Sequence, residues 1–217
     1  TRQAWSEAFD QLSAADDDSA LDPDDLERLG LAAALVGKDD VTIAVGVRTY
    51  DAFVGNGELT RAARCAFWLG MSLLERGEMA QGGGWLARAQ RLVEEIGPDC
   101  VERGFRLAPA GIQSLTQGDG ATAAALFEQA AQIADKYREP DLMALSRLGK
   151  GQALLQLGRI TEGVSLLDEA MLAVTAGGVS PLPTGIVYCA VISECMRIFD
   201  LRRAQEWTSA LSRWCEA

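Results

Sequence analysis

The sequence predicts an all-α protein, an α/α solenoid whose helical hairpins repeat every 40–41 residues. Three observations predict it: turn residues recur at this interval, small residues recur at fixed distances from the turns, and the stretches between them have helical apolar spacing. Of the 217 residues, 48% are hydrophobic, which is enough for a continuous core. We therefore expect residues 1–217 to form a single helical-repeat domain.

The turns have the clearest period. They begin at Gly37, Gly77, Gly118, Gly158 and Phe199, so successive turns lie 40, 41, 40 and 41 residues apart. Glycine is favoured just after a helix ends, because the left-handed backbone conformation there is disfavoured by a Cβ. Glycine in four of five turns therefore indicates where the first helix of each hairpin ends.

Small residues recur on both sides of these turns. Seven residues before a turn lie Gly30, Gly70, Gly111 and Gly151, with Ile192 in the last unit; five residues after it lie Thr42, Gly82, Ala123, Gly163 and Ala204. Glycine within a helix costs about 1 kcal/mol relative to alanine, so this recurrence predicts that two helices approach closely at these points. Packing explains Gly82-Gly83-Gly84 better than a phosphate-binding loop does.

The elements follow in order. We expect a lone helix at about 3–15, then hairpins at about 23–55, 58–96, 99–138, 141–176 and 183–215. Prolines open four of these hairpins, since proline suits a helix start: Pro23, Pro98, Pro140 and Pro181. Asp22 is the expected N-cap of the first, and Pro109 should kink or break its helix. The β-branched residues of 41–47 favour a strand locally, but the repeat predicts a helix.

Charge limits the partners. The net charge is −11, and an acidic chain repels phosphate backbones, so no binding of nucleic acid is expected from this segment. Residues 1–40 carry 11 acidic and 3 basic residues, a net charge of −8. We interpret the run Asp16-Asp17-Asp18 as a solvated loop between helices, because it lacks the spacing of a calcium-binding loop.

The reactive residue types argue against an enzyme. The chain has no histidine, which removes the commonest general base and metal ligand. Its five cysteines show no paired spacing, so neither a disulfide framework nor a zinc site is expected. We predict no catalytic residue, no metal and no cofactor.

No long apolar run suggests a membrane span, and the free thiols fit the cytoplasm. Because the chain begins with Thr1 and its last predicted helix has no following cap, we expect a fragment of a longer protein.

The register is similar to a known repeat. A small-x3-large-x2-small pattern after a glycine turn, with Leu69-Gly70 before it, resembles the tetratricopeptide repeat, although the period exceeds that family's 34 residues and Ala66 stands where an aromatic residue is usual. The stretches RAARCAFWLGMSLLERGEMAQGGGWLARAQRLVEE and DLRRAQEWTSALSRWCEA resemble the MalT-like helical repeats of actinobacterial LuxR-type transcriptional regulators. This resemblance covers most of residues 45–217. It implies a regulator's repeat region, without the helix-turn-helix domain that would bind DNA.

A groove is predicted along the first helices of the hairpins, which usually line the concave surface of such a solenoid. Apolar residues there lie beside basic ones, a combination that suits an amphipathic helix or a ligand bearing a carboxylate or phosphate. The alternative is that tight curvature buries this face. The candidate binding residues are Arg64, Phe67, Met71, Arg103, Arg106, Ile112, Arg147, Lys150, Gln152 and Cys189.

Two functions remain open from the sequence. One is a ligand- or protein-binding sensory module of a transcriptional regulator; the other is a stand-alone helical-repeat adaptor. The expected partner is a protein or peptide, with a small acidic ligand as a further candidate.

The last predicted helix carries Leu201, Ala204, Trp207, Leu211 and Trp214. One helix face rarely buries such a set completely, so we expect part of it to be exposed and to support a homodimer.

Overall fold

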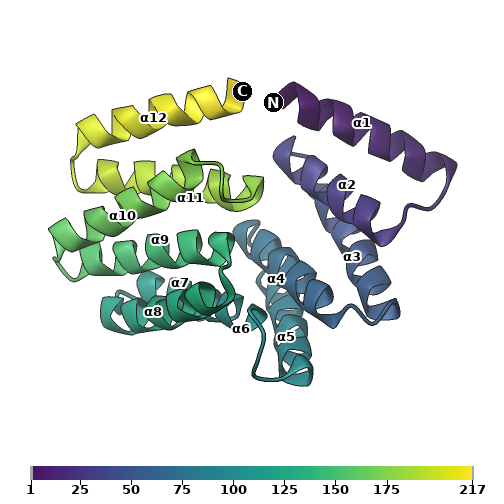
Figure 1. The fold of residues 1–217 in the computed structure, drawn as a ribbon, viewed down its shortest axis with the longest axis horizontal. Helices are drawn as coiled ribbons and strands as arrows, with labels where there is room; N and C mark the ends of the chain where they lie inside the picture. Colours follow the sequence, from purple (N-terminus) through teal and green to yellow (C-terminus); the bar gives the residue numbers. More distant parts are fainter. Residues whose placement is uncertain (1, 217) are drawn as a thin grey trace. The chain divides into compact units, whose positions relative to one another are not determined.

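The computed structural model describes residues 2–216, and in this range it contains helices and no strands (Figure 1). The chain forms two compact units, residues 2–102 and 103–216, which are described separately. Unit 1 contains α1 (Arg2–Asp18), α2 (Pro23–Leu35), α3 (Asp39–Gly55), α4 (Leu59–Glu75) and α5 (Met79–Ile96). The short α6 (Glu102–Phe105) begins at the boundary. Unit 2 continues with α7 (Leu107–Thr116), α8 (Gly120–Tyr137), α9 (Pro140–Gln156), α10 (Ile160–Thr175), α11 (Pro181–Arg197) and α12 (Leu201–Glu216).

The predicted repeat of turns is confirmed by the backbone. All five turn residues have positive φ angles: Gly37 75°, Gly77 81°, Gly118 79°, Gly158 74° and Phe199 61°. Each donates its N–H to a carbonyl three residues earlier, and the next residue donates to a carbonyl five residues earlier. These two hydrogen bonds satisfy carbonyls that the end of a helix would leave unpaired.

Two pairs of the recurrent glycines lie where paired helices cross, as predicted: Gly70 with Gly82, and Gly151 with Gly163. A Cβ added to Gly82 would lie 2.9 Å from the carbonyl oxygen of Gly70, and one added to Gly163 would lie 2.9 Å from that of Gly151. The backbones of α4 and α5, and of α9 and α10, are thus too close for any side chain at these points. By contrast, Gly83 has nothing within 4 Å of an added Cβ.

The N-terminal helix differs from the prediction. α1 extends to Asp18, so the run Asp16-Asp17-Asp18 is its last turn and not a loop. Acidic residues are unfavourable at a helix C-terminus, but the Asp16 carboxylate accepts two hydrogen bonds of 2.6 Å from Arg48 on α3. The Arg48 guanidinium lowers the pKa of Asp16. This ion pair joins residues 32 positions apart, so the local sequence does not predict it. It contacts the last turn of α1, by which the helix is longer than predicted.

The third hairpin is also modified. Pro98 lies in the loop before α6 and does not open a helix, whereas Pro140 and Pro181 begin α9 and α11 as predicted. Pro109 breaks its helix as predicted: α6 ends at Phe105 and α7 begins at Leu107. Proline has no N–H for the carbonyl four residues earlier, here that of Phe105, and its ring clashes with that carbonyl. The β-branched stretch 41–47 is helical within α3.

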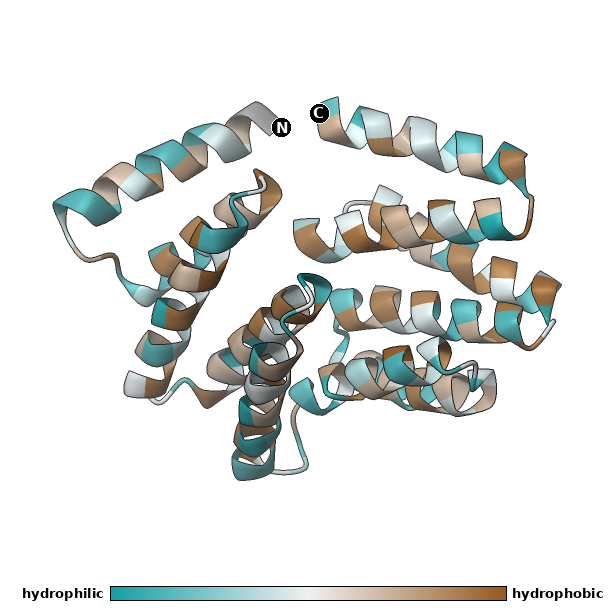
Figure 2. Ribbon diagram, turned by 180° about the vertical axis from the view of Figure 1, so that it is seen from behind, coloured by the Kyte–Doolittle hydropathy of each residue, from teal (hydrophilic) through white to brown (hydrophobic). Residues whose placement is uncertain are grey.

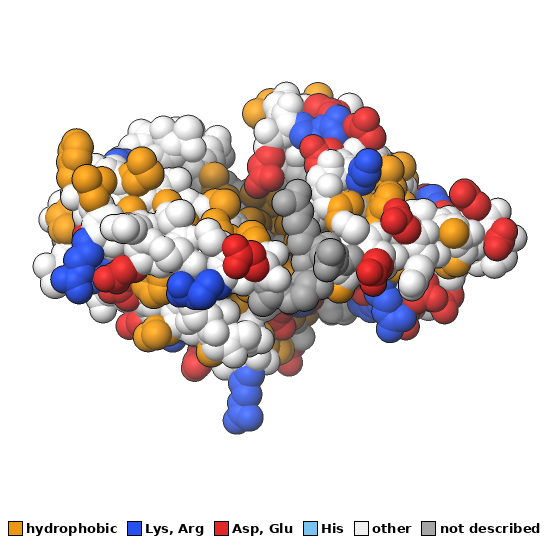
Figure 3. Space-filling view, turned by 90° about the horizontal axis from the view of Figure 1, so that it is seen from above, with side chains coloured by type: hydrophobic (Ala, Val, Ile, Leu, Met, Phe, Trp, Pro, Cys, Tyr) orange, Lys and Arg blue, Asp and Glu red, His pale blue; other side chains and the backbone are white. Residues whose placement is uncertain are grey.

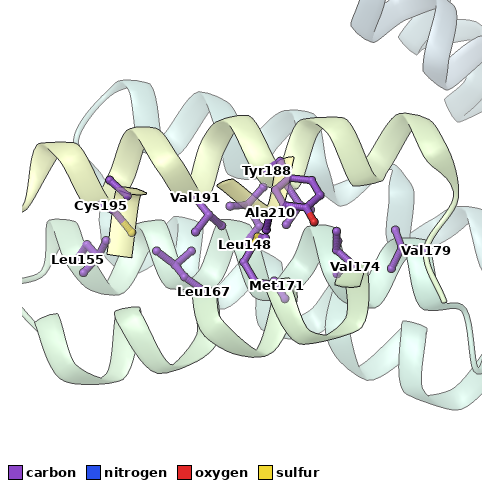
Figure 4. Close-up of a cluster of buried hydrophobic side chains, with 14 residues drawn as sticks. Leu148, Leu155, Leu167, Met171, Val174, Val179, Tyr188, Val191, Cys195 and Ala210 are labelled. Carbon is purple, nitrogen blue, oxygen red and sulfur yellow. The ribbon is translucent and has the colours of Figure 1, made fainter. Parts of the chain in front are cut away.

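Each unit has buried apolar clusters of its own. Hydrophobic residues recur between hydrophilic ones along each helix (Figure 2), as amphipathic helices require. The main cluster of unit 2 joins α9, α10, α11 and α12 (Figure 4). Its largest fully buried members are Leu167, Met171, Val187 and Val191. In unit 1, one cluster contains Leu26, Leu29 and Val45, and another contains Phe53, Ala62, Ala63, Leu92, Val93 and Cys100.

The last helix exposes part of its apolar set, as predicted. Ala204 and Ala210 are buried, and Trp207 and Leu211 pack against the core of unit 2. Leu201, however, is 63% exposed and Trp214 is 36% exposed. The Trp214 ring still lies 6.0 Å from the ring of Tyr188. Among the described residues, no helix is long and apolar enough to cross a membrane.

Candidate interaction surface

Three of the predicted binding residues lie on α9 and point to three different helices. Arg147 Nε lies 3.2 Å from Glu169 of α10, and Lys150 Nζ forms an ion pair with Glu128 of α8. Lys150 lowers the pKa of Glu128 by donating a hydrogen bond to its carboxylate. Gln152 donates a 3.1 Å hydrogen bond to Glu194 of α11. These side chains link neighbouring helices and do not converge on one ligand position.

Unit 1 contains three more of the predicted residues, all on α4. Arg64 lies 2.9 Å from the carboxylate of Glu102, whose side chain is only 3% exposed. Phe67 is buried and Met71 is half-buried. Phe67 therefore belongs to the interior, in keeping with the alternative that packing buries this face. The buried Glu102 was not anticipated, because a single glutamate at the start of a short helix carries no sequence signal of burial.

The other predicted residues are on the surface of unit 2. Arg103 on α6, Arg106 just before α7 and Cys189 on α11 are exposed, and Ile112 on α7 is 43% exposed. Partner binding by the ten predicted residues stays a prediction. Within unit 2, Arg147 and Lys150 of α9 face carboxylates on neighbouring helices.

A second surface of unit 2 was not identified from the sequence. Large apolar side chains are exposed on the turns that join α9 to α10 and α11 to α12. We call this surface the turn edge and define it by Leu157, Ile160, Met196, Phe199 and Leu201. Their exposed fractions are 45%, 45%, 57%, 86% and 63%. Figure 3 shows hydrophobic side chains beside Lys and Arg side chains at the end of unit 2 where α12 begins.

Phe199 is the most exposed of these side chains and has the least usual backbone. Its φ of 61° is left-handed, a conformation that is a genuine outlier for a bulky residue. Its N–H nevertheless donates to Met196 O at 3.1 Å, and Asp200 N–H donates to Cys195 O at 2.9 Å. The turn thus has the same hydrogen bonds as the four glycine turns. The sequence signal was present, because Phe199 is the one non-glycine in the series.

An ion-pair cluster holds the start of α12 against α10. Arg203 forms two hydrogen bonds of 3.0 Å to the two carboxylate oxygens of Asp168 and one of 2.6 Å to Asp200. Asp200 also accepts a 3.1 Å hydrogen bond from the backbone N–H of Arg203, so it caps α12. The Arg203 N–H and then its guanidinium lower the pKa of Asp200. Asp168, followed by Asp200, raises the pKa of Arg203.

A surface hollow of about 690 Å³ lies beside this cluster. Its apolar walls come from Ile160 and Val164 of α10 and from Ile198 and Phe199 of the turn, and its polar wall is the Asp168, Asp200 and Arg203 cluster. Such a hollow, with apolar walls and a few fixed polar groups, can receive a side chain of another molecule. Among the described residues, no group of three or more His, Cys, Asp or Glu side chains could hold a metal ion.

Comparisons with known proteins agree on the fold. No protein-family model and no curated protein matches the sequence. Among solved structures, BtubC (BKLC) from P. vanneervenii is similar over 83% of this chain and 76% of its own, with a TM-score of 0.51 and 18% identity. The apo form of RapI is similar over 97% of this chain, which spans 59% of RapI, with a TM-score of 0.46 and 10% identity. The consecutive helical hairpins, together with the similarity to BtubC, give this chain the fold of a helical-repeat protein.

Proposed function

We propose that this chain is the protein-interaction module of a transcriptional regulator. The observation that supports binding most directly is the turn edge, where five large apolar side chains are exposed on two neighbouring turns of unit 2. Contiguous exposed apolar side chains mark surfaces that bind other proteins. Stacked helical repeats suit this role because they present extended surfaces on a regular scaffold.

The regulator assignment is supported by the resemblance of residues 45–217 to the repeats of LuxR-type regulators. DNA binding is assigned outside this chain, because a net charge of −11 disfavours contact with phosphates. The alternative is a stand-alone adaptor. The sequence of the complete gene distinguishes the two, since a helix-turn-helix segment favours the regulator and its absence favours the adaptor.

Affinity capture tests the interaction function. The immobilised chain is exposed to an extract of the source organism, and retained proteins are cross-linked and identified by mass spectrometry. We expect at least one protein that excess free chain displaces, and no retention of labelled duplex DNA. If free chain displaces no protein, the interaction proposal is wrong.

We further propose that the chain has no catalytic activity and acts in the cytoplasm. The absence of histidine supports the first part, and five unpaired cysteines support the second. Hydrolysis of generic ester and phosphate substrates by the purified chain should not exceed the buffer rate. Fractionation of source cells should place the protein with the cytoplasmic proteins.

We also propose a homodimer through α12. Trp214 is partly exposed near the end of this helix, and an exposed tryptophan is a common anchor in protein interfaces. Between its two tryptophans α12 is more polar, because Thr208 and Ser212 stand at the positions that Leu167 and Met171 take 41 residues earlier. Sedimentation at increasing concentration should show association that Trp214→Ala reduces. A strict monomer at high concentration contradicts it.

A further inference from the structure

We propose that the turn edge of unit 2 binds an acidic amphipathic helix of a partner protein, with Phe199 as the apolar anchor. This inference rests on the proposed interaction function, and it adds the surface and the chemistry of the partner. Three observations carry it: the conformation and exposure of Phe199, the ion-pair cluster that holds its turn, and the exposure of Arg202.

The conformation of Phe199 is the first observation. Four equivalent turns place glycine at positive φ, where the absence of a Cβ removes the strain. Phe199 accepts that strain although its side chain is 86% exposed, so burial in the core does not compensate for it. Strained residues that the surrounding structure maintains are concentrated at functional sites. A protruding aromatic ring is also a typical anchor in protein interfaces.

The rigidity of the turn is the second observation. Arg203 binds both carboxylate oxygens of Asp168 and one of Asp200, and Asp200 caps the helix that follows Phe199. The hollow of about 690 Å³ opens beside the Phe199 ring, between α10 and the start of α12. An apolar side chain of the partner can enter this hollow while its neighbours cover the ring. Because the turn is already held in place, binding requires little ordering of it.

The exposure of Arg202 is the third observation. Residues 196–203 contain three arginines, of which Arg197 pairs with Glu194 and Arg203 pairs with Asp168 and Asp200. The most exposed of these arginines is Arg202, whose side chain is 90% exposed. Its ion pair with Glu206 is at the surface, where such pairs contribute little. Arg202 can therefore meet a carboxylate of the partner, which makes an acidic helix the complementary occupant.

A second copy of this chain fits the surface less well. A two-fold contact between turn edges would bring the exposed Arg202 of both copies together, because such an interface uses one patch twice. Like charges in contact are unfavourable. The partner is therefore a different protein, whose helix has apolar residues at i, i+3, i+4 and i+7 and glutamate or aspartate beside them.

A selection experiment tests the proposal without a known partner. The probe is a displayed library of 20-residue amphipathic helices, with leucine or phenylalanine at the apolar positions and glutamate, glutamine or lysine at the others. We expect selection on the intact chain to enrich glutamate-rich helices. Phe199→Gly should weaken their binding at least about tenfold while the melting temperature stays the same or rises, because glycine relieves the strain at this φ. Arg202→Glu should weaken binding about threefold to tenfold.

Matched controls lie in unit 1. Met79 is 63% exposed and stands at the same position after its turn as Leu201, so Met79→Ala should leave binding unchanged and Leu201→Ala should weaken it. Arg28 is another exposed arginine in a surface ion pair, and Arg28→Glu should have no effect. An equal loss of affinity in Met79→Ala and Leu201→Ala, or in Arg28→Glu and Arg202→Glu, would overturn the assignment of the binding site.

Several other outcomes also overturn the proposal. One is that the selection enriches lysine-rich helices, and another is that it enriches no helix at all. A third is that the selected helices bind the Phe199→Gly variant as tightly as the natural chain. Binding of the chain to phosphatidylserine vesicles in place of the peptides would reassign the edge to a membrane surface, and self-association abolished by Phe199→Gly would reassign it to a second copy. If affinity capture succeeds equally well with Phe199→Gly, the interaction function holds and only this surface is wrong.

Discussion

Individual residues show how burial separates chemically identical side chains. Cys100 and Cys195 are buried, and burial raises the pKa of Cys195 to about 11. Burial likewise raises the pKa of the half-buried Cys65 to about 12. Cys189 and Cys215 are exposed. Since the thiolate is the reactive form, position and not sequence context decides which cysteines react.

Thiol labelling checks this difference. In the folded chain at neutral pH, iodoacetamide should modify Cys189 and Cys215 and leave the other three cysteines largely unmodified. Peptide mass spectrometry counts the labels, and denaturant before labelling provides the control, in which all five should react. Rapid labelling of Cys195 in the folded chain would show that α11 and α12 do not pack as described.

Two adjacent glycines on α5 test the helix crossing. Gly82→Ala should destabilise the chain, because the new Cβ would lie 2.9 Å from the Gly70 carbonyl oxygen, and overpacking costs about 1–3 kcal/mol. Gly83→Ala should stabilise it by about 0.5–1 kcal/mol, because the site is open and alanine favours the helix. Urea unfolding measures both. Changes of equal sign would mean that the two backbones are not in contact at Gly82.

At the scale of helices, the units depend on long-range polar contacts as well as apolar packing. The Arg203, Asp168 and Asp200 cluster joins α10 to the start of α12, and Arg48 with Asp16 joins α3 to α1. Arg61 of α4 binds Asp24 and Glu27 of α2 and lies 4.1 Å above the ring of Phe53. These pairs link helices within each unit.

Asp200→Asn tests the contribution of the cluster. The folded pKa of Asp200 is lowered, so its ionised form stabilises the fold above the unfolded value of about 4. That stability is lost as the pH falls through the lower, folded pKa. We expect the variant to melt below the natural chain at pH 7 and at the same temperature near pH 2. A difference that persists unchanged at pH 2 would assign the effect to packing and not to charge.

At the scale of the whole molecule, each unit contains buried apolar clusters of its own. Phe127 is central to the packing of unit 2. Its ring occupies the space that side chains at Gly111 and Gly149 would need. In repeat proteins each pair of helices is stabilised mainly by its neighbours. A defect at Phe127 should therefore act first on unit 2.

Phe127→Ala tests this independence. Truncation of a buried phenylalanine costs about 3–5 kcal/mol, so amide hydrogen exchange should accelerate throughout α7 to α10. Exchange in α2 and α3, which share the core of unit 1, should stay unchanged. Mass spectrometry of peptides resolves the two units. Equal acceleration in both would show that the chain unfolds as one cooperative body.

The sequence by itself determined the helical class, the period of 40–41 residues and the close helix crossings, because these depend on local backbone preferences that recur. A left-handed turn after each first helix, and the glycine pairs at two of the crossings, can be recognised without knowing what lies nearby. The same logic located Asp22 as a cap and Pro109 as a break, both confirmed.

Only the tertiary structure decided which polar residues face one another and which apolar residues stay exposed. Arg147 and Lys150 look available in the sequence, but Glu169 and Glu128 on adjacent helices pair with them. Phe199 looks like an ordinary exception to a glycine pattern, yet the structure shows an exposed ring on a turn that Arg203 and Asp200 hold. Pairing and exposure depend on residues about 20 to 40 positions away, which periodicity alone does not place in contact.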